Sequence, residues 1–355
     1  MSDLLSRLTA IVIASVVGVG APAGAEQLAL ARGGMAASTP WLDISASKAA
    51  PKSKVPPVAD HGERPVLTSS GNRGSKPKTP PKPTYQPWMS TEVADAWASG
   101  YLGQGTSLMI VDDFSSRSFF SGNLGTGVQS LRHGEWTRLE SAMVAPSATI
   151  GSQDFSSGRA VPLARTGLTV VNLSYGLYAK SGLTPDQITW SAQESSLVNY
   201  AGKGTAVISK AAGNDAIAIG GSNRAGNTDY LNVALIGKPA AILVGAMDGT
   251  GTPDAPTTLA SYSNFAGSDP AVQQQFLTVG VRGDLTKLYG TSFAAPVVSG
   301  YAAILGSKFT SATPTQITSR LLDTARTDTI SDYSADRYGR GEASIARALA
   351  PSSIN

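Results

Sequence analysis

The sequence of 355 residues contains no cysteine and only two histidines. Without cysteine, the chain can form no disulfide bond, thiolate nucleophile, cysteine-ligated zinc site or iron–sulfur cluster. With two histidines, a site that needs two or three imidazoles is nearly excluded, and the sequence indicates no cofactor. A catalytic histidine, if the chain uses one, is therefore either His61 or His133.

Charge is sparse and unevenly placed along the chain. Charged residues make up 15% of the sequence, and the net charge is +3. Residues 1–25 are neutral, while residues 26–88 carry nine Lys or Arg against four Asp or Glu, which gives +5 and leaves −2 for the remainder. The basic excess thus belongs to one segment and not to a folded face. Nucleic-acid-binding domains cluster Lys and Arg on one face, so we expect no nucleic-acid partner.

The first 25 residues predict a cleaved signal peptide. Arg7 precedes an apolar run of 13 residues from Leu8 to Gly20, and Ala23-Gly24-Ala25 provides a small-residue cleavage site. As a helix, this run would reach only about 20 Å, short of the ~30 Å hydrocarbon core of a bilayer. No later segment is apolar enough to cross a membrane. We therefore expect a secreted or periplasmic protein without stable membrane insertion after signal cleavage.

Residues 26–88 predict a mostly disordered linker or pro-segment that is rich in proline and lysine. The stretch from Pro51 to Trp88 contains nine of the 21 prolines. Proline interrupts helices and sheet ladders, and the few large apolar residues here cannot offset the entropy lost on ordering. A pro-segment that blocks an active site needs enough apolar pattern to fold. This stretch has little, so a linker is favoured, and the pro-segment stays open as the alternative.

Residues 89–355 have the pattern of one folded domain, in which short apolar runs alternate with segments of helical periodicity. The runs are Ser107–Val111, Leu168–Leu173, Ala206–Ser209, Ala240–Val244 and Phe276–Val279, and the helix candidates include Gly134–Ala142 and Thr184–Tyr200. Such runs are typical of parallel strands covered on both faces. The alternation predicts an α/β fold: a doubly wound, mainly parallel sheet with helices on both faces. Active residues would then follow the carboxyl ends of its strands.

Polar residues with catalytic chemistry follow strands or open helices in this pattern. Asp112 and Asp113 come directly after the first strand, where a carboxylate can hold a histidine. His133 lies 21 residues after Asp112 and opens a helix candidate. Asn214 follows the strand at 206–209 and offers an amide suited to an oxyanion site. Taken alone, each residue also fits an ordinary turn or helix cap. The strand register favours Asp112 over Asp113.

The most specific signal is the segment Gly-Thr-Ser-Phe-Ala-Ala-Pro-Val-Val-Ser-Gly at 290–300. Ser292 lies in the first turn of a predicted helix, where free N–H groups and the helix dipole favour an anion beside the hydroxyl. A helix cap alone would not require the small residues that follow. The segment resembles the nucleophile motif of the subtilisin-like serine peptidases (family S8). The resemblance covers about 260 residues, and its C-terminal part most resembles the passenger peptidase domains of bacterial autotransporters.

The resemblance implies an Asp-His-Ser triad. Asp112 would orient His133, the general base that activates the nucleophile Ser292. Asn214 would donate a hydrogen bond to the oxyanion. The substrate-binding residues implied are Ser174, Tyr175, Gly176, Leu177, Ala212 and Gly213. The function implied is an exported serine endopeptidase that hydrolyses peptide bonds through an acyl-enzyme, and we expect a monomer whose partner is a protein or peptide substrate.

Three positions depart from the family pattern. Phe114 and Glu135 stand where small residues usually follow the acid and the histidine, and Glu135 adds a carboxylate close to the base. A catalytically inactive subtilisin-like module that binds proteins or peptides is therefore the alternative function. Leu177 stands where the family often has glycine, which would narrow the specificity pocket and favour small substrate side chains. Family members often bind structural calcium, but no motif here places such a site.

Two other interpretations are disfavoured by the order of residues along the chain. His61 is followed by Gly and Glu as His133 is, but it lies in the proline-rich stretch with no strand leading to it. A serine esterase of the α/β-hydrolase type needs Gly-x-Ser-x-Gly and a histidine after the nucleophile. The sequence has no such motif, and no histidine follows Ser292.

Overall fold

The computed structural model describes residues 9–11 and 83–354. Most of the predicted signal peptide and most of the predicted linker lie outside these ranges, so neither prediction is tested there. The three described residues near the N-terminus form a short strand, β1 (Thr9–Ile11). Among the described residues, we find no helix with both the length and the apolar character needed to cross a membrane.

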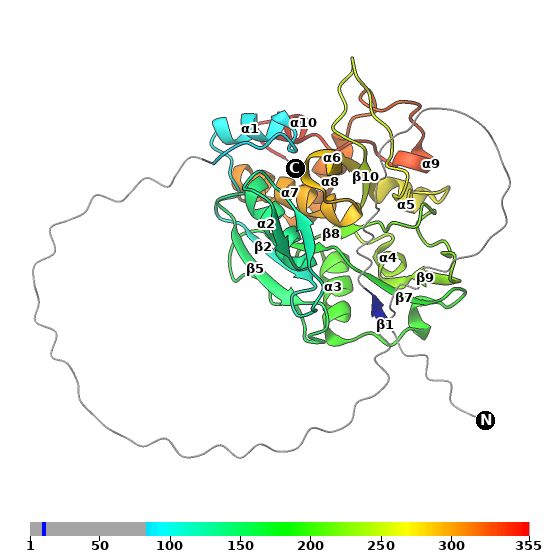
Figure 1. Ribbon diagram of the computed structural model, residues 1–355. Coiled ribbons are helices and arrows are strands. Elements are labelled where there is room, and N and C mark those ends of the chain that lie inside the picture. The colour runs from blue at the N-terminus through cyan, green and yellow to red at the C-terminus, as the bar shows by residue number, and fades with distance from the viewer. Residues whose placement is uncertain (1–8, 12–82, 355) are drawn as a thin grey trace, which may run out of the picture. The chain divides into compact units, whose positions relative to one another are not determined.

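A six-stranded parallel sheet forms the centre of the domain, with strand order β11-β10-β8-β6-β2-β5 (Figure 1). Its strands are β2 (Ser107–Asp112), β5 (Thr149–Asp154), β6 (Thr169–Leu173), β8 (Val207–Ala211), β10 (Ala241–Met247) and β11 (Phe276–Gly280). The chain runs from β2 to the edge strand β5 and then returns to β6 on the other side of β2. Ligands bind such sheets beside a reversal of this kind, outside the carboxyl ends of the strands. The predicted fold class is confirmed.

Alternate residues of the strands pack into two separate hydrophobic cores. In β6, Val170 packs into a core with helices α2 and α7, while Val171 and Leu173 pack into a core with α3 and α4. These helices are α2 (His133–Val144), α7 (Ala295–Lys308), α3 (Ala192–Lys203) and α4 (Tyr230–Leu235). Successive side chains of a strand point to opposite faces, so a strand covered on both sides is apolar throughout. This explains why the central strands were visible as continuous apolar runs.

Two elements differ from the sequence prediction. Edge strand β5 was missed because its side chains are mostly half-exposed and include serine, glutamine and aspartate, so it has no apolar run. The helix predicted over Thr184–Tyr200 begins too early. A short 3-10 turn, η1 (Pro185–Gln187), comes first, and Ser191 then accepts the Gln193 N–H and starts α3 as a new helix.

Shorter elements complete the domain. A hairpin of β3 (Phe120–Gly122) and β4 (Gln129–Leu131) precedes α2. Strand β7 (Gly176–Lys180) is the middle of an antiparallel sheet, between β1 and β9 (Asn227–Asp229). The remaining helices are α1 (Thr91–Ala98), α5 (Pro270–Gln275), α6 (Gly283–Thr286), η2 (Thr291–Phe293), α8 (Pro314–Asp323), α9 (Ala335–Tyr338) and α10 (Ile345–Leu349). The turn η2 leads directly into the buried helix α7.

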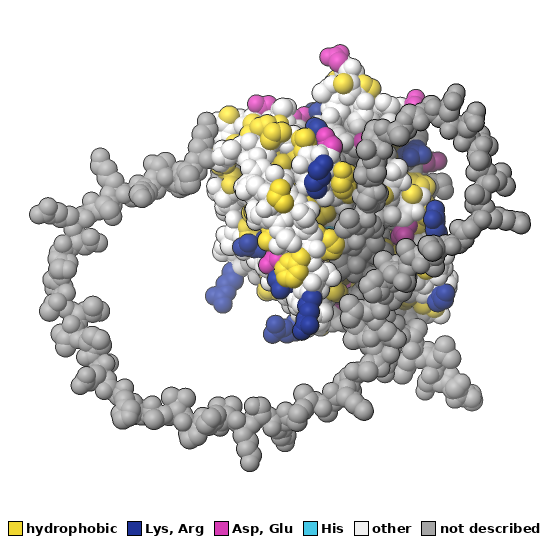
Figure 2. Space-filling view, viewed as in Figure 1, with side chains coloured by type: hydrophobic (Ala, Val, Ile, Leu, Met, Phe, Trp, Pro, Cys, Tyr) yellow, Lys and Arg dark blue, Asp and Glu magenta, His cyan; other side chains and the backbone are white. Residues whose placement is uncertain are grey.

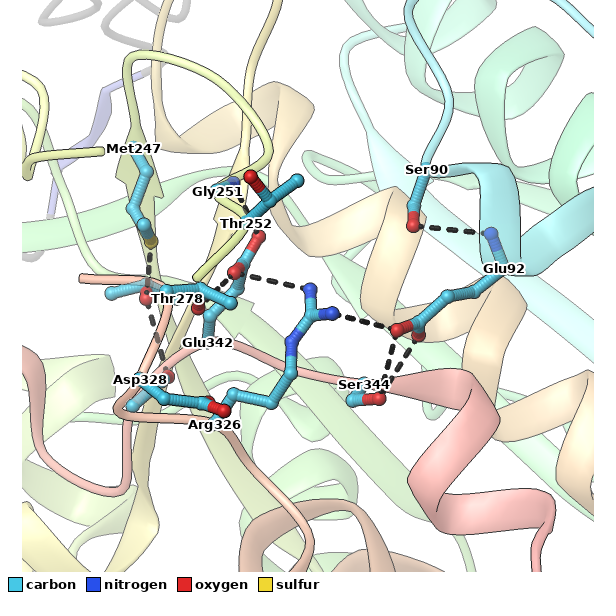
Figure 3. Close-up of polar contacts among 12 residues, drawn as sticks. Ser90, Glu92, Met247, Gly251, Thr252, Thr278, Arg326, Asp328, Glu342 and Ser344 are labelled. Carbon is cyan, nitrogen blue, oxygen red and sulfur yellow. Dashed lines mark hydrogen bonds and ion pairs between the residues drawn. The ribbon is translucent and has the colours of Figure 1, made fainter. Parts of the chain in front are cut away.

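A partly buried charge network joins α1 to the C-terminal part of the domain (Figure 3). Arg326 lies between Glu92 of α1 and Glu342, at 2.7 and 3.1 Å. The hydroxyl of Ser344, which caps α10, donates to Glu92 at 3.0 Å. Thr329 donates to Glu342 at 2.5 Å. Burial raises the pKa of Glu342, although Thr329 and Arg326 oppose the shift. The network therefore fastens the two ends of the folded domain to each other.

Some surface charges form ion pairs, such as Arg340 with Asp323 and Arg347 with Asp328. On the face shown in Figure 2, Lys and Arg side chains stand largely apart from one another among hydrophobic and polar groups. One exposed aromatic side chain, Phe119, has the guanidinium carbon of Arg132 at 4.8 Å from its ring centre. Of the predicted catalytic residues, Asp112, His133 and Ser292 are buried, and Asn214 is half-buried.

Candidate active site

Asp112 and His133 form a buried pair at the carboxyl end of β2. His133 Nδ1 lies 2.6 Å from Asp112 Oδ1, and the two side chains are 2% and 0% exposed. Thr137, one turn along α2 from the histidine, donates to Asp112 Oδ2 at 2.8 Å. The Asp113 N–H donates to Asp112 Oδ1 at 2.7 Å. Both carboxylate oxygens are thus held, which fixes the orientation of the imidazole ring.

Asp113 has a different environment from Asp112. Its Oδ1 accepts the N–H groups of Ser115 and Ser116 at 3.2 and 2.8 Å, the arrangement of an Asx turn. Its carbonyl accepts the Gly134 N–H at 2.9 Å. The structure therefore brings the side chain of Asp112, and not that of Asp113, against the imidazole. Asp113 closes the loop that follows β2.

Burial and charge act in opposite directions on His133. Burial is the largest effect and lowers its pKa, because the charged imidazolium would lose its hydration. The Asp112 carboxylate, through its charge and its hydrogen bond, and also the charge of Asp113, raise the pKa to a net value above 6.5. His133 Nε2 is buried and has no hydrogen-bond partner in the described part of the chain. A neutral imidazole with its proton on Nδ1 would present a free lone pair at Nε2.

The two unusual residues near the pair have structural roles. Glu135 accepts the Arg132 N–H at 2.8 Å and pairs with the Arg132 guanidinium at 3.3 Å, which caps the start of α2. Glu135 is not among the groups that shift the pKa of His133. Phe114 packs over Gly134, where a Cβ would lie 2.9 Å from the phenylalanine ring. Both departures therefore stabilise the N-terminus of α2 and the loop before it.

Ser292 lies in η2, directly before α7, and exchanges hydrogen bonds with Ser174. The Ser292 hydroxyl donates to the Ser174 carbonyl at 3.3 Å, and the Ser174 hydroxyl donates to the Ser292 carbonyl at 2.9 Å. The ring of His133 lies 5.7 Å, between centroids, from that of Phe293, the residue after the serine. In this rotamer the serine hydroxyl is directed at Ser174. In unliganded active sites, the hydrogen bond between nucleophile and base is often long and tightens only when substrate binds.

Asn214 is held by the turn that carries the serine. Its Oδ1 accepts the Thr291 N–H at 2.8 Å and the Thr291 hydroxyl at 3.1 Å. These two donors assign the oxygen of the amide, so Nδ2 is left as the donor. Nδ2 lies 3.2 Å from the point where a Cβ would stand on Gly290, whose φ of +123° suits glycine. Glycine at this position keeps free the space beside the amide donor.

A small cavity opens beside the serine and the asparagine. Its lining residues are Ser174, Tyr175, Gly176, Tyr178, Lys210, Ala211, Gly213, Asn214, Asp229, Thr291 and Ser292. Leu177 and Ala212, which the sequence analysis expected at the substrate, are not among them. Both are buried in the core that includes α3. Tyr178 and Ala211, their neighbours in sequence, face the cavity instead.

The cavity contains a buried ion pair that the sequence analysis missed. Lys210 Nζ lies 3.0 Å from Asp229 Oδ2 and donates to the Ala211 carbonyl at 2.5 Å. The Asp229 Oδ1 atom accepts the N–H groups of Leu177 and Leu231 at 2.9 and 3.1 Å, which joins β7 to the start of α4. A lysine inside a strand of small and apolar residues was the available signal, because a buried ammonium group requires a partner.

Two predictions gain no structural test. His61, the disfavoured candidate for the base, lies outside the described residues. Within residues 9–11 and 83–354, acidic and imidazole side chains do not gather in groups of three or more that could hold a metal ion. Calcium also takes backbone and side-chain carbonyls as ligands, so this finding does not test the expectation of structural calcium.

The fold and the site together define a class of protein. An acid–histidine pair at the end of a central parallel strand, with a serine at the start of a buried helix, is the arrangement of a subtilisin-like serine peptidase. The model of the subtilase family, Peptidase_S8, matches residues 133–341. The chain belongs to the subtilase family, and its class is that of serine peptidases, whose substrates are proteins or peptides. Asp112 precedes the matched range.

Solved structures that are similar to this chain include several proteases. The MycP3 protease of the type VII (ESX-3) secretion system is 20% identical, with 77% of this chain and 90% of that chain covered and a TM-score of 0.47. MycP1 from Mycobacterium smegmatis is 18% identical, with 77% and 86% covered and a TM-score of 0.46. A cold-adapted subtilisin-like serine proteinase is 18% identical, with 68% and 88% covered and a TM-score of 0.41. No curated protein matches the chain.

Proposed function

We propose that this chain is an exported serine endopeptidase with Asp112, His133 and Ser292 as its catalytic triad and Asn214 as its oxyanion donor. The observation that carries the proposal is the hydrogen bonding of the two ring nitrogens of His133. Its Nδ1 is fixed at 2.6 Å from Asp112, while its buried Nε2 has no partner within the described ranges. Buried polar atoms are normally hydrogen-bonded, so an unpartnered Nε2 calls for an explanation. A general base needs such a nitrogen.

In the proposed reaction, His133 takes the hydroxyl proton of Ser292 while Ser292 Oγ attacks the peptide carbonyl. Asp112 keeps the imidazole in the required tautomer and stabilises the imidazolium that forms. The oxyanion would lie between Asn214 Nδ2 and the backbone N–H of Ser292. His133 then gives the proton to the leaving amine, and water hydrolyses the acyl-enzyme through the same groups.

The substrate would bind as an extended strand along Ser174 to Gly176. The support comes from β1, whose residue Ile11 pairs with Gly176 of β7 in an antiparallel ladder. An edge that adds one strand can take another, and main-chain hydrogen bonds then supply affinity without regard to side chains. The pairing of β1 belongs to the chain before signal cleavage. Removal of the predicted signal peptide on export would free this edge for substrate, and we expect the mature protein to act as a monomer.

The second candidate function is a peptide-binding module without catalytic activity. The direction of the Ser292 hydroxyl favours it, because that group donates to the Ser174 carbonyl at 3.3 Å and is not directed at His133. A module of this kind would use the same edge of β7 and the same cavity. It would bind an extended peptide and release it uncleaved.

A fluorophosphonate probe separates the two functions. The probe phosphonylates a serine only where a base removes the hydroxyl proton, so we expect stoichiometric labelling of the wild-type chain and none of Ser292→Ala. Casein cleavage should follow the same pattern. The matched control is Ser299→Ala, which removes a buried hydroxyl of α7 that donates to the Ala295 carbonyl at 3.0 Å. Equal absence of labelling in the wild-type chain and in Ser292→Ala would favour the binding module.

The rate of cleavage should depend on pH through His133. The base must be neutral, and the pKa of His133 is raised above 6.5, because the charge and hydrogen bond of Asp112 outweigh burial. We therefore expect kcat/KM to fall as the pH is lowered through a value above 6.5, and to reach its plateau on the alkaline side. The measurement is initial rate of peptide cleavage between about pH 5 and pH 9. An acid limb centred well below 6.5 would contradict the assignment of the base.

A further inference from the structure

The side chain of Tyr178 lies across the cavity beside Ser292. A Cβ built on Gly176 would stand 2.6 Å from Tyr178 Cε2, and one built on Gly213 would stand 3.7 Å from the Tyr178 hydroxyl. Gly176 belongs to β7 and Gly213 to the loop after β8, so the tyrosine ring bridges the two walls. The space that remains is about 20 Å³, little more than the room for one water molecule.

The ring is held firmly in this position. Tyr178 is paired with Asp229 in the antiparallel ladder between β7 and β9, and its side chain is buried. Its hydroxyl lies close to the carboxylate of Asp215. Burial, and then the charges of Asp229 and Asp215, raise the pKa of the phenol, which is therefore neutral at physiological pH. A substrate side chain that needs the place of the ring would have to break these contacts.

The floor of the cavity is charged. Lys210 and Asp229 line it as a buried pair at 3.0 Å, and the known hydrogen bonds of both side chains go to protein groups. A long apolar side chain would lie against this pair and would give neither charge a partner. Contact of that kind costs free energy, because it keeps water away from two charged groups. Methyl and hydroxymethyl groups are the side chains closest in size to the about 20 Å³ that remain.

The structure assigns a specificity-determining role to Tyr178, an inference that rests on the proposed function. We propose that this side chain restricts P1, the substrate residue that supplies the scissile carbonyl, to glycine, alanine or serine. The cavity is the P1 pocket because its wall includes Ser292 and Asn214, the groups that would contact that carbonyl. The sequence predicts small substrate side chains on account of Leu177. Leu177 is buried in the core, so the restriction comes from Tyr178 on the opposite face of the strand.

Cleavage of a peptide series that differs only at P1 tests the inference. For the wild-type chain, we expect kcat/KM to be about 100-fold higher with alanine than with phenylalanine or leucine, the size of discrimination that pocket volume can supply. Tyr178→Ala should raise kcat/KM for the phenylalanine peptide by at least about tenfold. Tyr178→Leu keeps an apolar side chain of intermediate size, and should admit leucine before phenylalanine. Tyr178→Phe keeps the ring and should keep the preference for alanine.

Fluorophosphonate labelling of each variant distinguishes failure of this inference from failure of the proposed function. If the wild-type chain is labelled and cleaves the phenylalanine peptide as fast as the alanine peptide, Tyr178 does not restrict P1. The proposed peptidase function would still hold. Variants that are labelled but still reject large P1 residues overturn it as well. A wild-type chain that is neither labelled nor active overturns both. If Tyr178→Ala does not fold, two measurements remain. They are the wild-type ratio of kcat/KM for the alanine and phenylalanine peptides, and the cleavage of the leucine peptide by Tyr178→Leu.

Discussion

Replacing His133 with alanine is expected to lower kcat by about 10⁶-fold, the size of the loss that removal of the triad histidine causes in subtilisin. The physical reason is that Ser292 would keep its proton. Its hydroxyl has one observed acceptor, the neutral Ser174 carbonyl, which cannot take a proton at neutral pH. The imidazole alone combines a free nitrogen, burial and an anionic partner at 2.6 Å. The measurement is the turnover of an alanine-P1 peptide under saturating conditions.

The other histidine of the chain provides the matched control. His61→Ala makes the same chemical change in the segment that the sequence predicts to be a linker or pro-segment, and we expect its kcat to stay within about twofold of the wild-type value. Thermal unfolding of His133→Ala should be recorded beside the rate, since removal of a buried partner leaves Asp112 with only Thr137 and a backbone N–H. A His133→Ala protein that folds and still turns over substrate at a rate near that of the wild type would exclude His133 as the base.

The fold could be predicted where burial alone decides the structure. Strands such as β6 and β10 lie between two helical layers, so every residue is buried, most are apolar, and the run is visible in the sequence. The edge strand β5 has neighbours on one side only, and its polar residues conceal it. The start of α3 was predicted too early because Thr184 and Ser191 both suit the N-terminus of a helix. Only the packing of the folded chain distinguishes the two positions.

The sequence predicts some residues of the candidate site and not others. Asp112, His133, Asn214 and Ser292 could be proposed from local motifs and their order. The wall of the cavity could not, because it depends on which face of β7 is turned inward. Gly176 and Tyr178 share one face and Leu177 has the other, and a strand of five residues with apolar groups on both faces does not reveal its register. The pairing of Lys210 with Asp229 likewise joins β8 to β9 across a distance in sequence that no local pattern covers.

Replacing Asp112 with asparagine is expected to lower kcat by about 10⁴-fold, although the change hardly alters the size of the side chain. The carboxylate now accepts from His133 Nδ1, from Thr137 and from the Asp113 N–H. An amide in its place has one oxygen and one NH₂ group. If the oxygen keeps its present donors, the NH₂ group faces Thr137. If the NH₂ group turns towards His133, it favours the tautomer with the proton on Nε2, which cannot accept the proton of Ser292. Either arrangement removes the negative charge that stabilises the imidazolium.

Asp113→Asn is the control that separates the two neighbouring carboxylates. Asp113 Oδ1 accepts the N–H groups of Ser115 and Ser116, and an asparagine oxygen can accept the same two hydrogen bonds, so the turn should survive. Because Asp113 acts on His133 only through its charge, which raises the pKa, its loss should lower that pKa. The acid limb of the rate profile should then shift towards lower pH, with kcat on the alkaline plateau within about threefold of the wild-type value. Equal loss of kcat in the two variants would show that the orientation of the imidazole depends on both carboxylates and not on the 2.6 Å contact with Asp112 alone.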